Sequence, residues 1–264
     1  MKRILITGAT DGLGRALAFE LASRGYTLIL HGRNQEKGER LLEEILTKSP
    51  NSLLYYYNAN FESINQVKQL ATQVLENHQT LNGLINNAGL GFEAERSMSI
   101  DGYEKVFQVN YLSTYILSQM LLPLLEKTTN AHIINVSSGL HQPIDFNDPQ
   151  ITQNWTAMRA YAQSKLAQVT YTMALSKVLD PTLVRINALH PATAMPTKIV
   201  INHFDPQSSI QDGVNSLINL VENKDEKTQG KFFLETSESS PHQQALDKNA
   251  QQQLLELSKQ LTGV

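Results

Sequence analysis

The sequence predicts an α/β protein with a doubly wound parallel sheet of about seven strands flanked by helices. Short runs of Ile, Leu and Val alternate with longer segments whose apolar residues recur at the helical period. This alternation is typical of a parallel sheet that is covered on both faces. The chain has 264 residues, which is enough for one large domain and too few for two average domains with linkers. We therefore expect a single domain over residues 1–264.

Strands and helices are expected to alternate along the whole chain. The strands are short β-branched or leucine-rich runs at residues 3–7, 27–31, 53–57, 83–86, 132–136, 184–189 and 231–234. The helices have apolar residues three and four apart and are expected at residues 13–24, 36–47, 64–76, 102–126, 157–179, 209–221 and 243–261. Two stretches, 139–158 and 192–208, show no clear period. Long loops of this kind in a compact domain are usually functional or mobile.

The composition excludes several classes of function. Lys and Arg total 22 against 25 Asp and Glu, so no basic surplus exists to neutralise a phosphate backbone, and nucleic acid is not an expected partner. The chain has no cysteine, which excludes disulfides, thiolate metal sites and a cysteine nucleophile. We expect no metal site, and chemistry that runs on oxygen and nitrogen.

Neither a secretory signal nor a membrane anchor is expected. The apolar run at residues 4–6 is far too short for a signal peptide. The longest apolar stretch, 111–125, is interrupted by polar residues and falls below the roughly 18 residues that span a bilayer. A cytoplasmic protein without a membrane partner is the expectation.

A glycine-rich turn follows the first expected strand and opens the first expected helix. Its glycines, Gly8, Gly12 and Gly14, have the spacing G-x-x-x-G-x-G. Such glycines let backbone N–H groups approach a pyrophosphate, which the positive end of the helix also attracts. The common G-x-G-x-x-G form does not fit, because Leu17 stands where its third small residue would be. The expected cofactor contacts in this turn are Thr7, Gly8, Thr10, Asp11, Gly12, Leu13 and Gly14.

The end of the second strand indicates which dinucleotide binds. An acid there would bind the ribose 2′-hydroxyl of NAD, whereas an arginine accommodates the 2′-phosphate of NADP. The sequence has Gly32 and Arg33 at this point, and the first acid downstream is Glu36. NADP is therefore the expected cofactor, with NADPH preferred over NADH. A solvated arginine with no ligand is the alternative.

Tyr161 and Lys165 are four residues apart in an expected helix and project from one face. A tyrosine can donate or accept the proton in carbonyl reduction or alcohol oxidation if its pKa falls from about 10 toward neutrality. A lysine cation about 4 Å away at an effective dielectric of about 20 would supply an effect of that size. Ser138 ends the fifth expected strand and could hydrogen-bond the substrate oxygen, and the amide of Asn110 could hold a water for proton relay.

Together these motifs resemble the short-chain dehydrogenase/reductase family over nearly the whole chain. The glycine turn, the segment Asn86-Asn87-Ala88-Gly89 and the tetrad match the family in order; the tetrad consists of Asn110, Ser138, Tyr161 and Lys165. The resemblance implies a Rossmann-type fold with a dinucleotide-binding half, 1–136, and a catalytic and substrate-binding half, 137–264. It implies direct hydride transfer, a turn held in shape by Thr7 and Asn87, further cofactor contacts from Ala88 and Gly89, and nicotinamide-ribose binding by Tyr161 and Lys165.

Two finer expectations follow from the resemblance. The 22 residues between Ser138 and Tyr161 exceed the family's usual dozen or so, which looks like the retinol-dehydrogenase-like branch. The tail segments 230–233 and 254–258 resemble the same branch. The family's usual dimer face would be formed by the segments 102–126 and 157–179, so a homodimer or homotetramer is expected by analogy.

The sequence departs from the family pattern at three places. Asn60 stands where an aspartate commonly lies near the adenine amino group, and its amide can still accept a hydrogen bond. Ala192 replaces the glycine that usually follows Pro191. Pro196 occupies the position of an expected threonine, so Thr193 and Thr197 are both candidates for cofactor contacts, with Thr197 slightly preferred.

The expected function is NADP(H)-dependent interconversion of a carbonyl and an alcohol on a small, hydrophobic substrate. Apolar residues in the two long loops would line the substrate site, namely Leu140, Ile144, Phe146, Trp155, Met195, Ile199, Val200, Ile201 and Phe204. Two alternatives remain open: a regulator that binds NADP(H) without chemistry, and a scaffold protein on the same fold.

Overall fold

Eight strands form one sheet in the computed structural model of the chain, which describes residues 2–201 and 203–264. In spatial order the strands are β3 (Leu54–Asn58), β2 (Thr27–Gly32), β1 (Arg3–Ile6), β4 (Gly83–Asn86), β5 (Ala131–Val136), β6 (Val184–His190), β7 (Phe232–Leu234) and β8 (Ser237–Ser239). All neighbours pair in parallel except β7 and β8. The strand order reverses between β1 and β4, and open α/β sheets bind their ligands at such a switch point.

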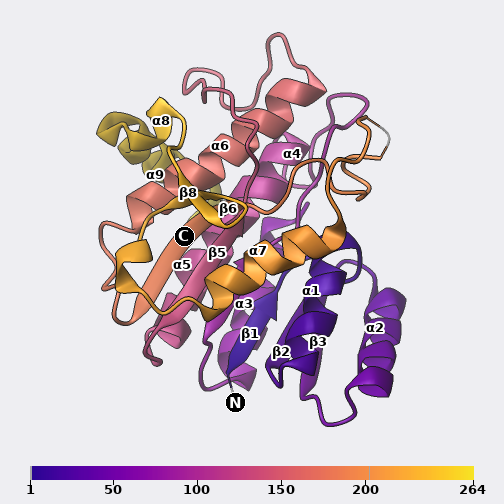
Figure 1. Ribbon diagram of the computed structural model, residues 1–264. Helices are drawn as coiled ribbons and strands as arrows, with labels where there is room; N and C mark the ends of the chain where they lie inside the picture. The colour runs from indigo at the N-terminus through magenta and orange to yellow at the C-terminus, as the bar shows by residue number, and fades with distance from the viewer. Residues whose placement is uncertain (1, 202) are drawn as a thin grey trace.

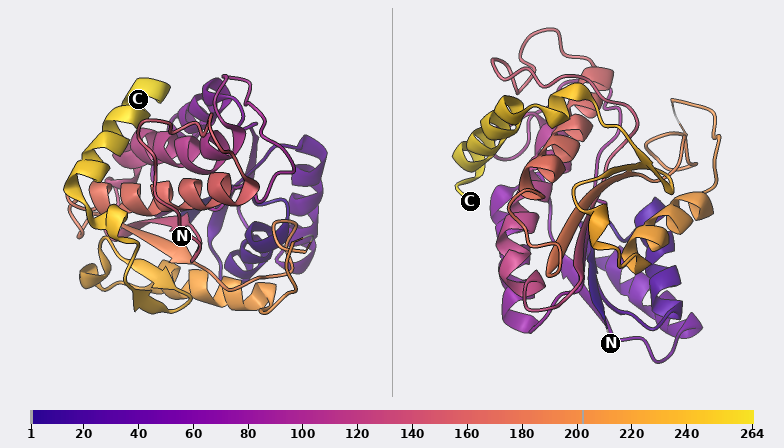
Figure 2. Two further views of the ribbon diagram at one scale, coloured as in Figure 1. Left: turned by 90° about the horizontal axis from the view of Figure 1, so that it is seen from above. Right: turned by 60° about the vertical axis from the view of Figure 1, so that its left-hand side comes forward.

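Helices cover both faces of the sheet, so the described chain has three layers (Figures 1 and 2). One face packs against α1 (Gly12–Ser23), α2 (Gln35–Lys48) and α7 (Ile210–Glu222). The other packs against α3 (Ile64–Asn77), α5 (Ser113–Leu125), α6 (Ala157–Leu175) and α9 (Lys248–Thr262). Alternate strand residues face the two layers: Ile4 and Ile6 belong to the first core and Leu5 to the second.

Side-chain caps explain where several helices begin. Asp11, Asn34 and Ser63 accept hydrogen bonds from the first turns of α1, α2 and α3. Thr156 does the same for α6, and Ser209 forms a reciprocal capping box with Asp212 at the start of α7. These caps satisfy N–H groups that have no partner within the helix. The expected starts at residues 13, 36, 64, 157 and 209 are thus confirmed to within one residue.

The structure corrects the expected elements in five places. The strand β8 was not expected, because its sequence Ser-Glu-Ser is polar and exposed. The expected helix 102–126 is instead α4 (Lys105–Phe107), a π turn η1 (Gln108–Leu112) and α5. The expected helix 157–179 ends at Leu175, and the expected helix 243–261 is divided into α8 (Gln243–Leu246) and α9. A short 3-10 turn, η2 (Glu226–Thr228), lies before β7.

The two long loops are confirmed as irregular, since no helix or strand occurs at residues 139–156 or 191–209 within the described chain. None of the described helices is both long and apolar enough to span a bilayer.

Candidate active site

A single cavity of about 930 Å³ lies at the edge where the parallel strands end, and it collects most of the expected site residues. Those that line it are Gly8, Thr10, Asp11, Gly12, Leu13, Gly14, Arg33, Asn60, Asn87, Ala88, Gly89, Ser138, Tyr161, Lys165, Pro191, Thr193 and Thr197. Two expected residues, Thr7 and Asn110, are buried behind its wall. The cavity therefore connects the glycine turn to the Tyr161 and Lys165 pair.

The glycine turn is packed so closely that larger residues would not fit. A Cβ on Gly14 would stand 2.3 Å from the carbonyl oxygen of Gly8, and one on Gly8 would stand 2.8 Å from Cα of Ala88. Gly8 also has φ +66, in the left-handed region that favours glycine. The turn thus brings backbone, rather than side chains, to the cavity wall.

Thr7 and Asn87 fasten this turn to the end of β4. The Thr7 hydroxyl donates to the Ile85 carbonyl (3.3 Å) and accepts from the N–H groups of Asn87 and Ala88 (2.9 Å each). The Asn87 amide donates to the carbonyls of Thr7 (2.8 Å) and Gly8 (3.3 Å). The geometry fits the shaping role that the family resemblance implies for both side chains.

The amino end of α1 has free donors facing the cavity. The Asp11 carboxylate accepts from the Gly12 N–H (2.8 Å), whereas the N–H groups of Leu13 and Gly14 bond to none of the described residues. Unpaired first-turn amides at a helix amino end form an anion site, so this cradle fits a pyrophosphate. Asp11 also pairs with Lys198 from the loop after β6, and this hydrogen bond is the main cause of the lowered pKa of Asp11.

The end of β2 has no room for an acidic side chain at Gly32. A Cβ on Gly32 would stand 2.7 Å from the Thr10 methyl and 2.8 Å from the Tyr56 hydroxyl, so no longer side chain fits there. Arg33 and Lys37, both exposed, line the adjoining part of the cavity. Neither has an ion-pair partner among the described residues. Two cations without ion-pair partners among the described residues, next to a position that excludes an acidic side chain, suit a phosphate group.

Tyr161 and Lys165 lie together at the other end of the cavity, both almost fully buried. The Lys165 ammonium is 5.8 Å from the centre of the Tyr161 ring. Burial lowers the pKa of Lys165 to about 7. Burial also raises the pKa of Tyr161, opposed by the neighbouring Ser138 hydroxyl. In the protein without cofactor, the net effect of burial and of Ser138 is a raised pKa of Tyr161.

The side chain of Asn110 is held by hydrogen bonds within the protein. Its side-chain oxygen accepts from the Leu90 N–H (2.7 Å), and its amide donates to the Leu90 carbonyl (3.1 Å) and the Ser164 hydroxyl (2.9 Å). The side chain is fully buried, and both of its N–H donors bond to groups of the protein. It fixes the loop after β4 against α6.

The remaining expected contacts occupy different parts of the cavity. The Asn60 side chain accepts from the Glu62 N–H (3.1 Å) at the cavity wall after β3. The methyl group of Thr197 would be 3.4 Å from a Cβ on Gly12, so this threonine lies against the glycine turn. Thr193 instead interacts with the His190 ring (3.2 Å). Of the two threonines, Thr197 is the one placed beside the phosphate cradle.

The apolar side of the cavity is only partly as expected. Leu140, Met195, Ile199, Val200 and Phe204 line it. The prediction was wrong for Ile144, Phe146 and Trp155, which pack into the core clusters, and for Ile201, which lies outside the lining. Apolar composition alone does not separate a loop residue that faces a cavity from one that faces the core.

Sequence reasoning missed an aromatic cluster on the cavity wall. The Phe92 ring lies 4.8 Å from Tyr161, 5.2 Å from His203 and 5.4 Å from Phe204, measured between ring centres. Phe92 follows the Asn86–Gly89 segment in an irregular loop, where no periodic pattern could indicate its direction. Gln168, Lys37 and Lys198 were also not singled out.

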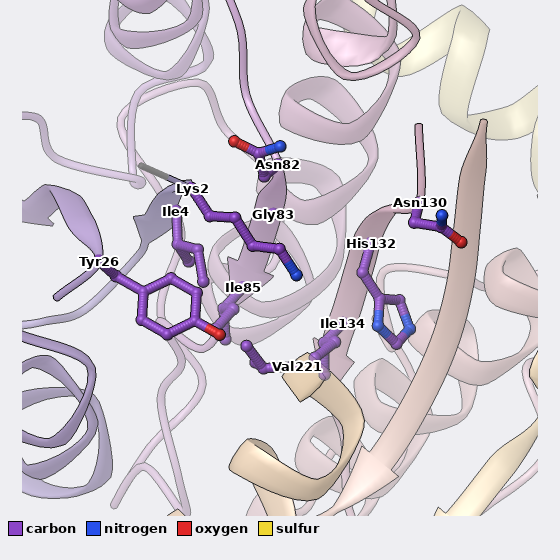
Figure 3. Close-up of a pocket in the computed structure, with 10 residues that line it drawn as sticks. All are labelled: Lys2, Ile4, Tyr26, Asn82, Gly83, Ile85, Asn130, His132, Ile134 and Val221. Atoms are coloured by element: carbon purple, nitrogen blue, oxygen red, sulfur yellow. The ribbon is translucent and has the colours of Figure 1, made fainter. Parts of the chain in front are cut away.

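A second, much smaller cavity lies at the opposite edge of the sheet and has room for about one water molecule, at about 10 Å³. Its lining includes Lys2, Tyr26, Asn82 and His132, and Figure 3 shows the Lys2 ammonium and the Tyr26 hydroxyl directed into the same space. It is too small for a metabolite. Within the described residues, no group of His, Asp and Glu side chains is placed to hold a metal ion.

The chain is similar in sequence to a known family and to named relatives. A family model described as short chain dehydrogenase matches residues 2–207. Human retinol dehydrogenase 13 is 36% identical over 196 residues, covering 73% of this chain but only 59% of the relative. Mouse retinol dehydrogenase 13 is 30% identical over 289 aligned positions, covering 100% of this chain and 84% of the relative.

Solved structures share the fold. A protein from Escherichia coli CFT073, described as a short chain dehydrogenase in complex with NADPH, superposes with a TM-score of 0.72 and 26% identity, covering 89% of this chain and 97% of that one. A Mycobacterium paratuberculosis protein superposes with a TM-score of 0.79 over 100% of this chain and 94% of its own length, at 24% identity. The chain belongs to the short-chain dehydrogenase family, whose members are NAD(P)-dependent oxidoreductases.

Proposed function

We propose that the protein uses NADP(H) to interconvert a carbonyl and an alcohol on a small, hydrophobic substrate, with reduction as the main direction. The observation that carries this proposal is one continuous cavity with an anion cradle and free cations at one end and Tyr161, Lys165 and Ser138 at the other. A hydride-transfer site needs this combination: a place for the dinucleotide phosphates and a proton donor beside the reacting carbon.

Arg33 and Lys37 would hold the 2′-phosphate, and the amino end of α1 would hold the pyrophosphate. The family resemblance assigns the nicotinamide ribose to Tyr161 and Lys165. When bound, the nicotinamide supplies the hydride for reduction. The E. coli structure in complex with NADPH supports this cofactor.

Tyr161 would donate its phenolic proton to the substrate oxygen as that oxygen becomes an alkoxide. The Ser138 hydroxyl would hydrogen-bond the same oxygen and hold it in line with the phenol. The Lys165 ammonium stabilises the phenolate left on Tyr161, since an opposite charge nearby favours the charged form. In the oxidising direction the same phenolate accepts the alcohol proton.

Aromatic and aliphatic side chains on the cavity wall support an apolar substrate. Phe92 lies directly against the Tyr161 ring, and Phe204 lies against Phe92. Leu140, Ile199 and Val200 add aliphatic surface. The relatives named retinol dehydrogenases agree with a substrate that carries a long apolar group.

The replacement Tyr161→Phe tests this function. NADPH consumption would be followed with benzaldehyde, decanal and retinal as carbonyls of graded size. The variant should bind NADPH as the wild type does but lose turnover by at least about a hundredfold, because the general acid is removed. Turnover within about tenfold of wild type would refute the role of the phenol.

Tyr171→Phe is a matched control, since Tyr171 is a buried tyrosine on the same helix whose hydroxyl accepts from Gln119 (3.1 Å). It should lower stability by about 1 kcal/mol and leave turnover unchanged. A wild-type protein that binds NADPH and reduces none of these carbonyls would instead favour a regulator without chemistry.

A further inference from the structure

Gln168 is a fully buried glutamine on α6, one turn beyond Lys165. Its side-chain oxygen accepts from the Lys165 ammonium (3.1 Å). Its amide nitrogen donates to the backbone carbonyl of Asn110 (2.8 Å) and to the hydroxyl of Thr114 (3.1 Å). One side chain thus connects the π turn that contains Asn110 to the lysine of the cavity.

The contacts of Gln168 use both the acceptor oxygen and the donor nitrogen of its carboxamide. A glutamine presents an acceptor and two donors in one rigid plane, so it can bind a cation on one side and a carbonyl on the other. The Thr114 hydroxyl also donates to the Asn110 carbonyl (2.8 Å). Gln168 links that carbonyl to the Lys165 ammonium. Neither an aliphatic side chain nor a carboxylate could make both bonds.

The Lys165 ammonium has three N–H donors, and two of them are accounted for. One goes to the Val136 carbonyl (2.9 Å) and one to Gln168. Because these two acceptors lie within the protein, the third donor is left for the cavity and the Tyr161 side. The two bonds therefore set both the position and the direction of the cation.

We propose that Gln168 is a positioning residue: it anchors the Lys165 ammonium to the π turn and keeps that ammonium charged and directed at Tyr161. This inference rests on the proposed function for its catalytic meaning, although the contact itself is independent of substrate. The carbonyl that Gln168 binds belongs to the π turn η1, and such turns often occur at functional sites.

Other titratable groups near Lys165 do not account for its charge. Tyr161 on the same helix is neutral until its raised pKa is reached. His141, from the loop after β5, has its pKa lowered to about 4 by burial, so it is neutral at and above pH 6. Burial is the cause of the lowered pKa of Lys165, and no carboxylate contributes to it. The ammonium therefore depends on uncharged acceptors.

The test measures the titration of Lys165 directly in protein without cofactor. Lysine labelled with ¹³C and ¹⁵N at the side-chain terminus would be followed by NMR from about pH 5.5 to 10, with the Lys165 signal assigned from its loss in Lys165→Arg. Gln168→Met keeps the length of the side chain and removes the acceptor. The Lys165 midpoint should fall by about one pH unit, as expected for loss of a hydrogen bond to a charged group.

Gln168→Glu should move the Lys165 midpoint upward, because a carboxylate favours the ammonium more strongly than an amide does. Opposite shifts in two variants cannot arise from general loosening of the fold. Gln251→Met is the matched control: Gln251 is also buried and also connects a lysine, Lys177, to a backbone carbonyl, that of Ala245, but lies away from the cavity. It should leave the Lys165 midpoint unchanged.

Kinetics provide the second measurement, using the best carbonyl and its alcohol from the substrate panel. In Gln168→Met the acid limb of alcohol oxidation should move to higher pH and kcat should fall by about tenfold, with KM changing less. An unchanged Lys165 midpoint in Gln168→Met, or the same shift in Gln251→Met, would overturn the inference. Failure of the proposed function would instead appear as absent turnover in the wild type, whatever the Lys165 titration does.

Discussion

At the scale of single residues, the environment of Arg33 provides the strongest indication of cofactor selection. Other arginines near it are paired: Arg15 with Glu44 and Arg40 with Glu36. Arg33 has no such partner among the described residues and faces the cavity beside Gly32, where a side chain cannot fit. The charge of Arg33 is therefore available to a ligand.

Replacing Arg33 by alanine should raise the Kd of NADPH by about ten- to a hundredfold and leave that of NADH nearly unchanged. The reason is that a charge-assisted contact to a phosphate is worth about 1.5–3 kcal/mol and only NADPH has the 2′-phosphate. Titration calorimetry with both nucleotides measures the two constants. Arg40→Ala is the control, since Arg40 is exposed on α2 and already paired. Equal losses for NADPH and NADH would contradict the assignment.

Site residues that are marked by a fixed interval or by a glycine requirement of the backbone were predictable from the sequence. Tyr161 and Lys165 follow from a four-residue interval on a helix, and the glycine turn follows from Gly8 and Gly14, whose positions admit no Cβ. Gln168 and Phe92 were not predictable, because each depends on contacts with elements far along the chain. Asn110 was found for its type and place, but only the structure shows that its amide is occupied.

At the scale of elements, two buried histidines join parts of the sheet through their neutral rings. His31 accepts from the Gly8 N–H (3.3 Å) and contacts the Ala59 carbonyl (3.0 Å), which links β2 to the glycine turn and to the end of β3. His132 accepts from the Asn187 amide (2.9 Å) and contacts the carbonyl of Leu220 (2.9 Å), linking β5 to β6 and α7. In each ring one nitrogen must accept, so protonation breaks a bond between elements.

These histidines predict a loss of stability in mild acid. Burial lowers the pKa of His31 to about 4 and that of His132 to about 3. Both values lie below the roughly 6.5 of an unfolded histidine. At pH values between the folded and the unfolded pKa, the unfolded chain binds more protons than the folded protein does. The free energy of unfolding therefore falls as the pH falls. Each ring should cost about 2 kcal/mol between pH 7 and pH 4.5.

Urea unfolding measured across this range checks the prediction. The carboxylates with lowered pKa titrate below the window and do not compete; they are Asp11, Asp148, Asp180 and Asp212. Buried Glu104 has a raised pKa and acts in the opposite direction. His132→Gln, which can keep one donor and one acceptor, should be less stable at pH 7 but lose less on acidification. If the free energy of unfolding falls with pH by the same amount in wild type and variant, His132 is excluded as a cause of the loss of stability.

Helices and strands with a clear apolar pattern in their own sequence were predictable. Elements that depend on hydrogen bonds to neighbouring segments were not. The strands β1, β2, β4, β5 and β6 are buried between two helical layers, so sequence patterns were sufficient. The edge strand β3 is only partly buried, but its run of Leu and Tyr residues still indicated a strand. The strand β8 is polar and exists only by pairing with β7 after Glu235 adopts φ 56. The break between α8 and α9 depends on Asp247, which caps α9 by accepting from Asn249 and Ala250. Competing local hydrogen bonds of this kind leave little trace in periodicity.

At the scale of the whole molecule, α9 packs against α6 and lies across one end of the helices that the family resemblance assigned to a dimer interface (Figure 2). The Tyr111 hydroxyl bonds with that of Ser258 (2.5 Å), and the hydroxyls of Tyr103 and Tyr115 donate to the carbonyls of Leu261 (3.1 Å) and Val264 (2.8 Å). Every residue of α6 from Ala160 to Leu175 is buried within the single chain. The chain thus occupies with its own helix part of the face that a partner subunit would need.

We therefore expect a monomer in place of the homodimer or homotetramer that family analogy suggests. A stable interface usually buries about 1,200–2,000 Å², and neither α5 nor α6 offers free apolar surface on that scale, since Pro123 alone is exposed on α5. Light scattering coupled to size exclusion, from low to high micromolar concentration, should give a constant mass near 29.5 kDa. A stable dimer at micromolar concentration would show that association uses another face, which hydrogen exchange would then locate as protection outside α5, α6 and α9.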